Sequence, residues 1–392
     1  MSRGTLLSGF PWACLAYSLC RFPFLIQTAD IWGPYGIGFT IVLVNLAIWH
    51  VHVSMKVRTS KPSCHSAIWS VALALCLMGF ILVYGNHKSS HPWQGNVRVA
   101  AIQGAFDQSV KWDPAYRLAT MERYTSLTKK AKQQFPDLSL VVWPETAMPF
   151  YFQEGGQLKK EIEGLARELH VSILFGNPSY FYDSTGRLRY RNSAYLLGPD
   201  GSSRGRYDKQ HLVPFGEYMP WGKLTSWARD FVPTAGDFSA GRNPAPLASG
   251  NFRIGVMICF ESIFPEISAK EVKKGANILA VITNDAWFGR TAAPFQHADM
   301  AVFRAVETRR WLIRAANTGV SRIIAPSGKI MASTQLFTPC FISGLVRLEH
   351  GKTFFVRYGA YWFFLLNLLF ILMNYIKTWL EKRNDHGKNS TG

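Results

Sequence analysis

Three side chains of the types that acyl-transfer chemistry requires each lie beside the end of a predicted strand. Glu145 follows "LSLVVWP", Lys209 lies in "GRYDKQHLVPFGEYMP", and Cys259 follows "FRIGVMI". A thiol becomes a strong nucleophile when a nearby base removes its proton, and a carboxylate with a raised pKa can serve as that base. Attack on an acyl carbon creates an oxyanion, which a fixed cation stabilises. A Glu, a Lys and a Cys can therefore supply a base, an oxyanion stabiliser and a nucleophile.

Taken one at a time, these residues also have structural explanations. A free cysteine such as Cys259 is often a small buried hydrophobe. Glu145 could cap a turn or a helix, and Lys209 could form a solvated surface pair with Asp208. A structural interpretation is also open for four other polar residues: Glu217, Glu261, His211 and His297.

The surrounding residues predict alternating strands and helices from Asn96 onward. Apolar runs predict strands at "NVRVAAIQGAF", "LSLVVWPET", "VSILFGNPSYF", "NSAYLLGPDGSSRGRYDKQ", "FRIGVMICFES" and "NILAVITNDAWFG". Helices are expected over residues 117–133, 157–170, 266–274 and 296–314, and "SRIIAPSGKIM" is expected to form a hairpin. This pattern indicates an α/β domain with a largely buried sheet, in which strand ends and the loops after them converge on one ligand-binding edge.

Three apolar runs without charged residues lie outside this domain, and each is about long enough to cross a bilayer. They are "YGIGFTIVLVNLAIWHVHV", "AIWSVALALCLMGFILVYG" and "YGAYWFFLLNLLFILMNYI". The predicted spans cover about residues 33–53, 66–85 and 356–378. An earlier apolar stretch, about residues 6–27, is interrupted by Pro11, Arg21 and Pro23 and predicts a partial segment. A cleavable signal peptide fits poorly, because no small-residue cleavage site follows.

Lysine and arginine residues next to the spans predict their orientation. "HVSMKVRTSKPSCHS" and "KTWLEKRNDHGK" are rich in these residues, and such segments stay on the cytoplasmic side. The predicted domains are an N-terminal membrane region (1–88), an extracytoplasmic catalytic domain (89–355), the last span (356–378) and a cytoplasmic polar tail (379–392). For an external domain, the net charge of +18 suits anionic lipid headgroups better than nucleic acid.

The cysteines give little sign of a disulfide framework or of a metal site. Of the six, Cys259 and Cys340 fall in the predicted external domain, and a disulfide between them is a less favoured alternative to free thiols. No Cys/His cluster has the spacing of zinc ligands, so neither a metal nor another cofactor is expected.

The order Glu145 in "WPET", Lys209 in "YDKQHLVPFGEYMP" and Cys259 in "ICFES" resembles the nitrilase (carbon–nitrogen hydrolase) superfamily. The segments "GFPWACLAYS", "QSVKWDP", "WPETAMPF", "LVPFGEYMP", "TNDAWFG" and "RAANTGVS", with the flanking spans, are similar to those of apolipoprotein N-acyltransferases. The resemblance implies a four-layer α-β-β-α sandwich on the periplasmic side of a bacterial inner membrane, between transmembrane helices of a multi-pass protein.

The resemblance also implies a reaction: a fatty acyl group passes from a membrane phospholipid to the amino group of diacylglyceryl-cysteine in an apolipoprotein, the final step of lipoprotein maturation. In the implied ping-pong course, Cys259 is the nucleophile that forms a thioester, Glu145 is the acid and base, and Lys209 stabilises the oxyanion. Four further residues match positions that support the site: Glu217, Glu261, Trp112 and Phe260.

The sequence departs from the family pattern in two places. Phe260 follows the cysteine where some members carry a tyrosine. Members also usually have several transmembrane helices ahead of the "GFPW" segment, which begins eight residues after the first residue here. Two alternatives to the transferase therefore stay open: a membrane-anchored amidase of the nitrilase fold that acts on a small substrate, and an inactive shortened form.

Overall fold

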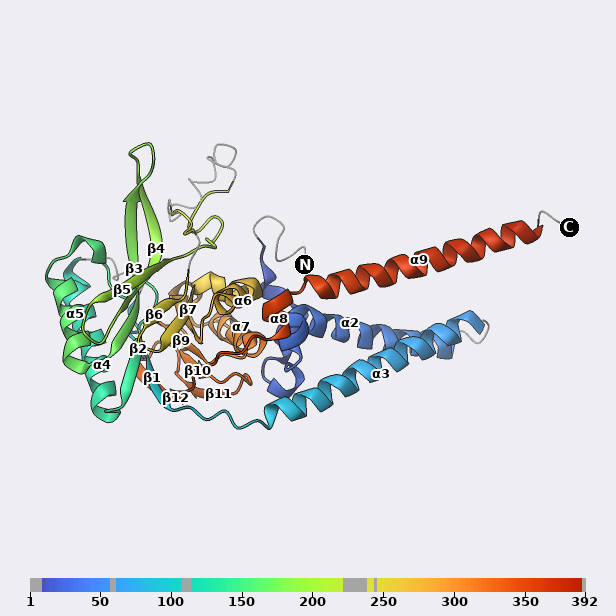
Figure 1. Ribbon diagram of the computed structural model, residues 1–392, viewed down its shortest axis with the longest axis horizontal. Coiled ribbons are helices and arrows are strands. Elements are labelled where there is room, and N and C mark those ends of the chain that lie inside the picture. Colours follow the sequence, from blue (N-terminus) through green and yellow to red (C-terminus); the bar gives the residue numbers. More distant parts are fainter. Residues whose placement is uncertain (1–8, 57–60, 108–113, 221–237, 243–244, 390–392) are drawn as a thin grey trace.

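The computed structural model of the chain describes residues 9–56, 61–107, 114–220, 238–242 and 245–389 (Figure 1). Two six-stranded sheets pack face to face, and helices cover the outer face of each sheet. The predicted four-layer α-β-β-α architecture is confirmed. Three long helices extend away from one side of this sandwich: α2 (Ala29–Lys56), α3 (Lys61–Ser89) and α9 (Tyr361–Asn389).

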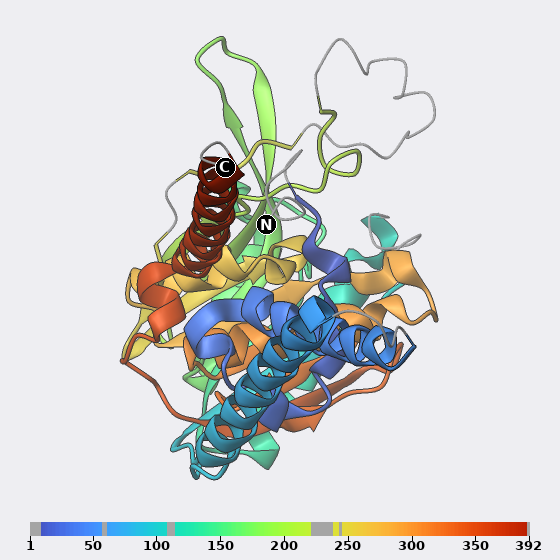
Figure 2. The same cartoon turned by 90° about the vertical axis from the view of Figure 1, so that its right-hand side faces the viewer.

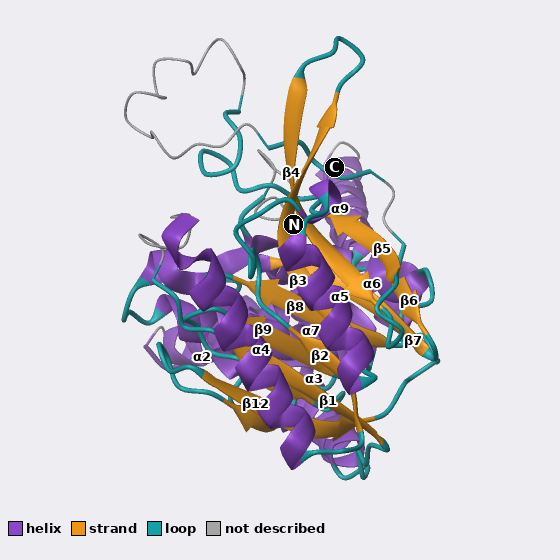
Figure 3. Cartoon of the chain, turned by 90° about the vertical axis from the view of Figure 1, so that its left-hand side faces the viewer, coloured by secondary structure: helices purple, strands orange, loops and turns teal. Residues whose placement is uncertain are grey.

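The first sheet carries the N-terminal half of the catalytic domain and one late strand. Its strands, in spatial order, are β12 (Cys340–Val346), β1 (Val97–Gln103), β2 (Leu138–Val142), β3 (Ser172–Tyr182), β4 (Leu188–Leu197) and β5 (Ser203–Asp208). The neighbours β1, β2 and β3 are parallel, and the other pairs are antiparallel. The helices α4 (Arg117–Gln134) and α5 (Gln157–Leu169) cover its outer face (Figure 3).

The second sheet has a similar arrangement. Its strands, in spatial order, are β11 (Ile330–Ser333), β10 (Arg322–Ile324), β9 (Leu312–Ala316), β8 (Ile278–Thr283), β7 (Phe252–Ile258) and β6 (Leu247–Ser249). Strands β7, β8 and β9 are parallel. The helices α6 (Pro265–Lys273) and α7 (Ala293–Thr308) pack on its outer face. Shorter elements connect the layers: η5 (Pro114–Tyr116), η6 (Phe152–Glu154) and α8 (Phe354–Tyr358).

The apolar patterning explains why these segments form central strands. Every residue of "ILAVIT" in β8 is buried, as expected for a parallel strand covered on both faces. Val256 and Ile258 of β7 point into the core between the two sheets, whereas Met257 points toward the outer helices. This alternation of side chains fixes the register of β7, because a slip of one residue would exchange the two faces.

The predicted helix over residues 296–314 is wrong at its C-terminal end. Helix α7 ends at Thr308, Arg309 adopts the left-handed conformation (φ 51°), and residues 312–316 form β9 beside β8. A left-handed residue after the last turn is a common helix terminator. Periodicity could not separate the two elements, because a short buried apolar run fits a helix or a strand. The strands β6 and β12 were also not predicted.

The predicted membrane spans fall on long apolar helices. Helix α2 and residues Ala67–Ser89 of α3 are both long and apolar enough to cross a membrane. Figure 2, seen from the side from which they extend, shows α2 and α3 packed together. Helix α9 contacts α2 at its first turn, where Phe363 packs on Trp32, and its later part lies apart from both helices. The apolar part of α9 that the structure describes, Tyr361–Met373, is shorter. Helix α2 is kinked at Gly33, which has a φ of 65° and lies directly before Pro34.

The apolar segment predicted over residues 6–27 is not one continuous helix. From Gly9 onward it forms three short turns: η2 (Pro11–Ala13), η3 (Leu15–Leu19) and η4 (Pro23–Leu25). Ala16 and Tyr17 are buried against the catalytic domain, and the Tyr17 hydroxyl accepts a hydrogen bond from Arg304 of α7 at 3.1 Å. This segment therefore packs on the catalytic domain and leads directly into α2.

A buried ion pair joins the start of α2 to the catalytic domain. The Arg309 guanidinium donates to Asp30 Oδ2 at 2.7 and 2.9 Å and to Gln27 Oε1 at 2.6 Å. Tyr84 of α3 donates to the same Asp30 carboxylate at 2.9 Å. The left-handed turn at Arg309 that ends α7 also carries the side chain that holds α2 and α3 against the domain.

We expect Arg309→Ala to lower the free energy of unfolding by about 3 kcal/mol, because it leaves the Asp30 carboxylate buried without its cation. Unfolding of the full chain in lipid nanodiscs measures the change. The control is Arg98→Ala, which removes an exposed pair with Asp137 and should cost about 1 kcal/mol or less. Equal losses in the two variants would contradict a structural role for the Arg309 pair.

Candidate active site

The predicted catalytic residues lie at strand ends from both sheets. Glu145 follows β2 by three residues, and Lys209 follows β5 directly. Cys259 is the first residue after β7 and begins the turn η8 (Cys259–Ile263). The backbone N–H of Asn284, directly after β8, donates to Glu145 Oε2 at 2.8 Å. This contact joins the end of β2 in one sheet to the end of β8 in the other.

The Glu145 carboxylate is held on both of its oxygens. Oε1 accepts from the Asn192 side-chain amide at 2.7 Å, and Oε2 accepts from the Asn284 backbone. Only 7% of the residue is exposed. Its backbone lies so close to β3 that a Cβ added to Gly176 would be 2.6 Å from the Glu145 Cα. The backbone and side-chain contacts together fix the orientation of the carboxylate.

Lys209 is a buried cation that two carboxylates neutralise. Its Nζ donates to Glu217 Oε1 at 2.8 Å and lies 3.9 Å from Glu145 Oε1. Burial lowers the pKa of Lys209, but the charges of Glu217 and Glu145 outweigh this effect and raise it above its ordinary value. Burial likewise acts to raise the pKa of Glu217, and the Lys209 charge reverses the shift to a lowered value. Both partners therefore stay ionised at neutral pH.

Cys259 adopts a backbone conformation that is uncommon for a residue with a side chain. Its φ of 51° lies in the left-handed region, where the chain turns sharply from β7 into η8. Burial and then the Glu145 charge raise the pKa of the thiol, while Lys209 acts in the opposite direction. The resting side chain is therefore a neutral thiol that requires a base in the site.

Glu261 connects the two segments that carry Lys209 and Cys259. Its Oε1 accepts from the backbone N–H groups of Gln210 and His211 at 2.6 and 3.1 Å. Its Oε2 accepts from the backbone N–H of Ile258 at 2.7 Å and from the Tyr207 hydroxyl at 3.0 Å. These four hydrogen bonds hold the residues after β5 against the end of β7, so Glu261 has a positioning role.

The two other predicted supporting residues have different outcomes. Phe260 is buried, and its ring packs against Phe10, His211 and Phe264 with centroids 5.1 to 6.0 Å away. It is thus part of an aromatic cluster beside the nucleophile. Trp112 lies outside the residues that the structure describes.

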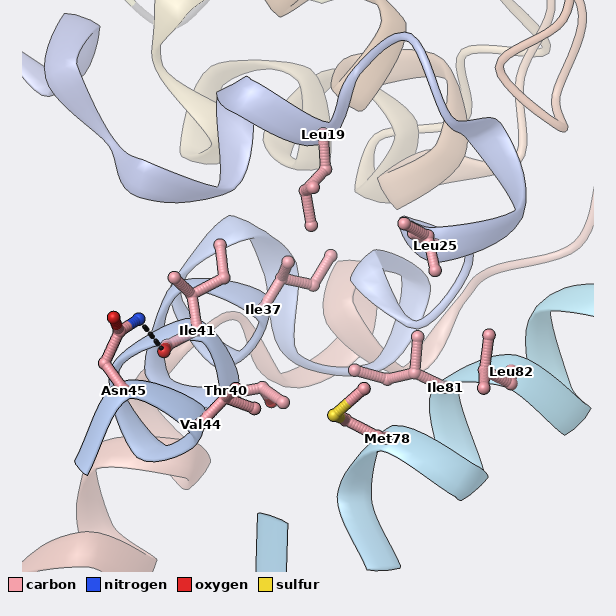
Figure 4. Close-up of a pocket in the computed structure, with 10 residues that line it drawn as sticks. All are labelled: Leu19, Leu25, Ile37, Thr40, Ile41, Val44, Asn45, Met78, Ile81 and Leu82. Atoms are coloured by element: carbon pink, nitrogen blue, oxygen red, sulfur yellow. Dashed lines mark hydrogen bonds between the residues drawn. The ribbon is translucent and has the colours of Figure 1, made fainter. Parts of the chain in front are cut away.

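A pocket lies between α2, α3 and the N-terminal turns, and none of its lining residues belongs to the candidate active site (Figure 4). Aliphatic side chains and Met78 line most of it. The two polar residues on its wall, Thr40 and Asn45, donate to carbonyl groups of their own helix. None of the described residues that line the pocket has a titratable side chain.

Comparison with known proteins identifies the family. The carbon-nitrogen hydrolase family model matches residues 98–350, and the apolipoprotein N-acyltransferase N-terminal domain matches residues 1–47. The apolipoprotein N-acyltransferase of Geobacter metallireducens is 46% identical over 91% of this chain and 68% of its own length. The chain belongs to the apolipoprotein N-acyltransferase family. The Azotobacter vinelandii member is 33% identical over 92% of this chain and 67% of its own length.

Solved structures of two other proteins support the fold of the catalytic domain of this chain. Nit3 of Saccharomyces cerevisiae, a member of branch 10 of the nitrilase superfamily, has a TM-score of 0.50 and 19% identity. The match covers 66% of this chain and 92% of the Nit3 chain. The C. elegans NitFhit protein also has a TM-score of 0.50, with 18% identity over 66% of this chain and 62% of its own.

Sequence reasoning missed two polar groups of the site in this family member. The Asn192 amide donates to Glu145 Oε1 and also to Glu217 Oε1 at 3.0 Å, so it joins the two carboxylates. Asn192 lies within β4 between Arg191 and Ser193, so its polarity did not distinguish it from its neighbours. Asn284 contributes a backbone N–H, which carries no sequence signal beyond the motif "TNDAWFG".

Cys259 and Cys340 are both free thiols, so the disulfide alternative is wrong. Cys340 lies in β12, opposite Gln103 of β1. Among the described residues, no group of three or more His, Cys, Asp or Glu side chains could hold a metal ion. The Cys259 side chain is therefore not part of a disulfide bond.

Glu271 on α6 contrasts with Glu261. Both are fully buried, and burial raises the pKa of each carboxyl to about 7. Backbone N–H groups oppose the shift at Glu261, whereas the Glu261 charge adds to the shift at Glu271. Neither Glu271 oxygen has a hydrogen-bond partner among the described residues. Replacement by Gln should therefore disrupt hydrogen bonds at Glu261 and none among the described residues at Glu271.

We expect Glu261→Gln to destabilise the fold by about 2 kcal/mol at about pH 8, because its amide N–H₂ would face hydrogen-bond donors. Glu271→Gln should stabilise it instead. A folded pKa of about 7, above the ordinary value of 4.5, gives stability that is present at low pH and lost as the pH rises through about 7. The gain from Glu271→Gln should therefore grow between about pH 5 and pH 8. Thermal unfolding across this range tests both, and a pH-independent difference would contradict the assignment.

Proposed function

We propose that the chain transfers a fatty acyl group from a membrane phospholipid to the N-terminal amine of diacylglyceryl-cysteine in apolipoproteins. Membership of the family supports this substrate class. The observation that carries the chemistry is the buried Lys209 ammonium between Glu145 and Glu217, with the Cys259 thiol close enough for these charges to shift its pKa. The apolar helices α2 and α3 support an enzyme that meets lipid substrates.

In the first half-reaction, Cys259 attacks the ester carbonyl of the phospholipid. Glu145 accepts the thiol proton as the C–S bond forms, because the raised thiol pKa disfavours a free thiolate beforehand. The resulting oxyanion receives hydrogen bonds from Lys209. The C–O bond then breaks, and Glu145 returns the proton to the leaving oxygen. The products are a lysophospholipid and a Cys259 thioester.

In the second half-reaction, the amine of the apolipoprotein attacks the thioester carbon. Glu145 accepts a proton from the amine as the C–N bond forms, and Lys209 again stabilises the oxyanion. The C–S bond breaks and Cys259 recovers its proton from Glu145. One carboxylate therefore serves as base and acid in both halves. The lysophospholipid leaves before the amine binds to the thioester form, which gives ping-pong kinetics.

The groups around this triad have supporting roles. Glu217 neutralises Lys209, so the ammonium stays charged although only 1% of its side chain is exposed. Asn192 donates to both carboxylates and so links the two acids that neutralise Lys209. The hydrogen bond from the Asn284 backbone N–H holds the Glu145 carboxylate in place for proton transfer. Glu261 aligns the segments that carry Lys209 and Cys259.

We infer that the protein is a multi-pass protein of the bacterial inner membrane, with residues 89–355 as its catalytic domain on the periplasmic side. The Lys/Arg-rich segments that follow α2 and lie near the end of α9 support this orientation. The helices α2, α3 and α9 all leave the same side of the sandwich, as spans of one membrane would (Figure 1).

We expect Cys259→Ala to reduce acylation of a diacylglyceryl lipopeptide by at least about three orders of magnitude, because alanine cannot form the thioester. The assay uses the full chain in nanodiscs with phospholipid as the only acyl donor. Cys340→Ala is the matched control and should retain wild-type activity, since Cys340 lies in the edge strand β12 and is paired with Gln103 of β1, not with a triad residue.

Undiminished acylation by Cys259→Ala would overturn the mechanism. Hydrolysis of short amides by the wild-type chain tests the amidase alternative with the same protein. Rapid amide hydrolysis without any lipopeptide acylation would replace the transferase assignment with an amidase. Activity in neither assay would favour the inactive form.

A further inference from the structure

The buried ring of His297 contacts the turn that carries the nucleophile. His297 lies on α7 and is 1% exposed. Its Nε2 is 3.2 Å from the carbonyl oxygen of Cys259 and 2.9 Å from Ser262 Oγ. The Ser262 hydroxyl donates to the same carbonyl at 2.8 Å. Two side chains therefore converge on the backbone of Cys259 from outside the catalytic cluster.

The partners of the ring determine where its hydrogens lie. A carbonyl oxygen can only accept, so the contact with Cys259 places a hydrogen on Nε2. On the other side of the ring, Nδ1 is 2.9 Å from Asp285 Oδ1. Burial acts to raise the pKa of Asp285, but the Arg314 and His297 charges hold it well below its usual range. Asp285 is thus an ionised acceptor.

Asp285 is itself fixed by two further donors. Thr283 donates to Asp285 Oδ1 at 2.9 Å, and Arg314 donates to Asp285 Oδ2 at 2.8 Å. Arg314 Nη2 also lies 3.1 Å from His297 Nδ1, close to the Asp285 contact. Thr283 ends β8, the strand directly before Asn284 of the site, and Arg314 lies in the neighbouring strand β9, so the central strands of the second sheet hold the ring.

The N-terminal segment covers one face of this ring. Trp12 stacks on His297 with ring centroids 5.5 Å apart and planes at 27°, and its Nε1 donates to Gln296 at 2.9 Å. Phe288 contacts the ring edge-on at 6.2 Å. These two half-buried aromatic rings pack on the buried imidazole and leave it little freedom to rotate.

We propose that His297 is a positioning residue for acyl transfer, which donates from Nε2 to the Cys259 carbonyl and so holds the nucleophile in its left-handed conformation. The φ of 51° at Cys259 is unfavourable for a residue with a side chain and persists only if the surroundings fix it. A hydrogen bond from His297 to the Cys259 carbonyl opposes rotation of that peptide group out of the left-handed conformation. The direction of the sulfur toward Glu145 then depends on a residue that touches no substrate. This inference rests on the proposed function.

A matched pair of substitutions tests the donor. In His297→Gln the side-chain amide reaches the position of Nε2, and in His297→Asn it reaches only the position of Nδ1. We expect His297→Asn to slow single-turnover transfer of a radiolabelled acyl chain from phospholipid to Cys259 on the order of 10²-fold, as a misplaced reacting group does. His297→Gln should recover most of the rate. The KM for phospholipid should stay unchanged in both variants.

Alkylation of Cys259 by iodoacetamide, followed by mass spectrometry, gives a readout that does not depend on acyl transfer. Alkylation of Cys259 should slow more in His297→Asn than in His297→Gln. If the wild type forms no thioester while alkylation still follows this order, the proposed function fails and the positioning role stands. Equal rates for Asn, Gln and wild type in both measurements would overturn the positioning role, as would a loss confined to KM.

Ser262→Ala keeps the inference testable if both His297 variants fail to fold. It removes the second donor to the same carbonyl and leaves the ring in place, so the acylation rate should fall severalfold at constant KM. A wild-type rate would contradict the idea that carbonyl support sets the position of the sulfur. Ser249→Ala, which removes a buried serine pair with Ser172 elsewhere in the domain, controls for general loss of stability.

Discussion

The candidate site depends on keeping the Lys209 ammonium charged inside the protein. A buried cation is unstable unless carboxylates and hydrogen bonds surround it. Glu217 supplies the direct partner at 2.8 Å, and Glu145 lies 3.9 Å away, so the cation is shared unequally between the two acids. The unequal sharing leaves Glu145 available for proton transfer. It also leaves Lys209 with hydrogen-bonding capacity for an oxyanion.

This arrangement requires strand ends from two different sheets to meet. The end of β2 brings Glu145, the end of β5 brings Lys209, and the end of β7 brings Cys259. Backbone donors link these ends: Asn284 binds Glu145, and Gln210 and Ile258 bind Glu261. The face-to-face packing of the sheets is therefore a condition for the chemistry, because the base belongs to one sheet and the thiol to the other.

The sequence predicted the parts of this architecture that depend on local pattern. Buried runs such as "ILAVIT" identified central strands, and the amphipathic face of α5 identified an outer helix. The end of α7 was missed because the apolar residues after Arg309 suit a helix or a strand equally well, and the pairing with β8 decides between them. Asn192 and Asn284 were missed because their roles arise from contacts between distant segments. The triad itself came from a resemblance of motifs, since composition could not have selected it.

The central claim is a covalent acyl intermediate on Cys259, and intact-protein mass spectrometry tests it most directly. The full chain in nanodiscs is incubated with phospholipid of a single acyl-chain composition, without an apolipoprotein acceptor. The account predicts a mass increase of one acyl group, located on Cys259, that hydroxylamine removes and that a diacylglyceryl lipopeptide discharges with formation of the N-acylated product. Transfer of the acyl group to the lipopeptide with no adduct on Cys259, or with an adduct on another residue, would contradict it.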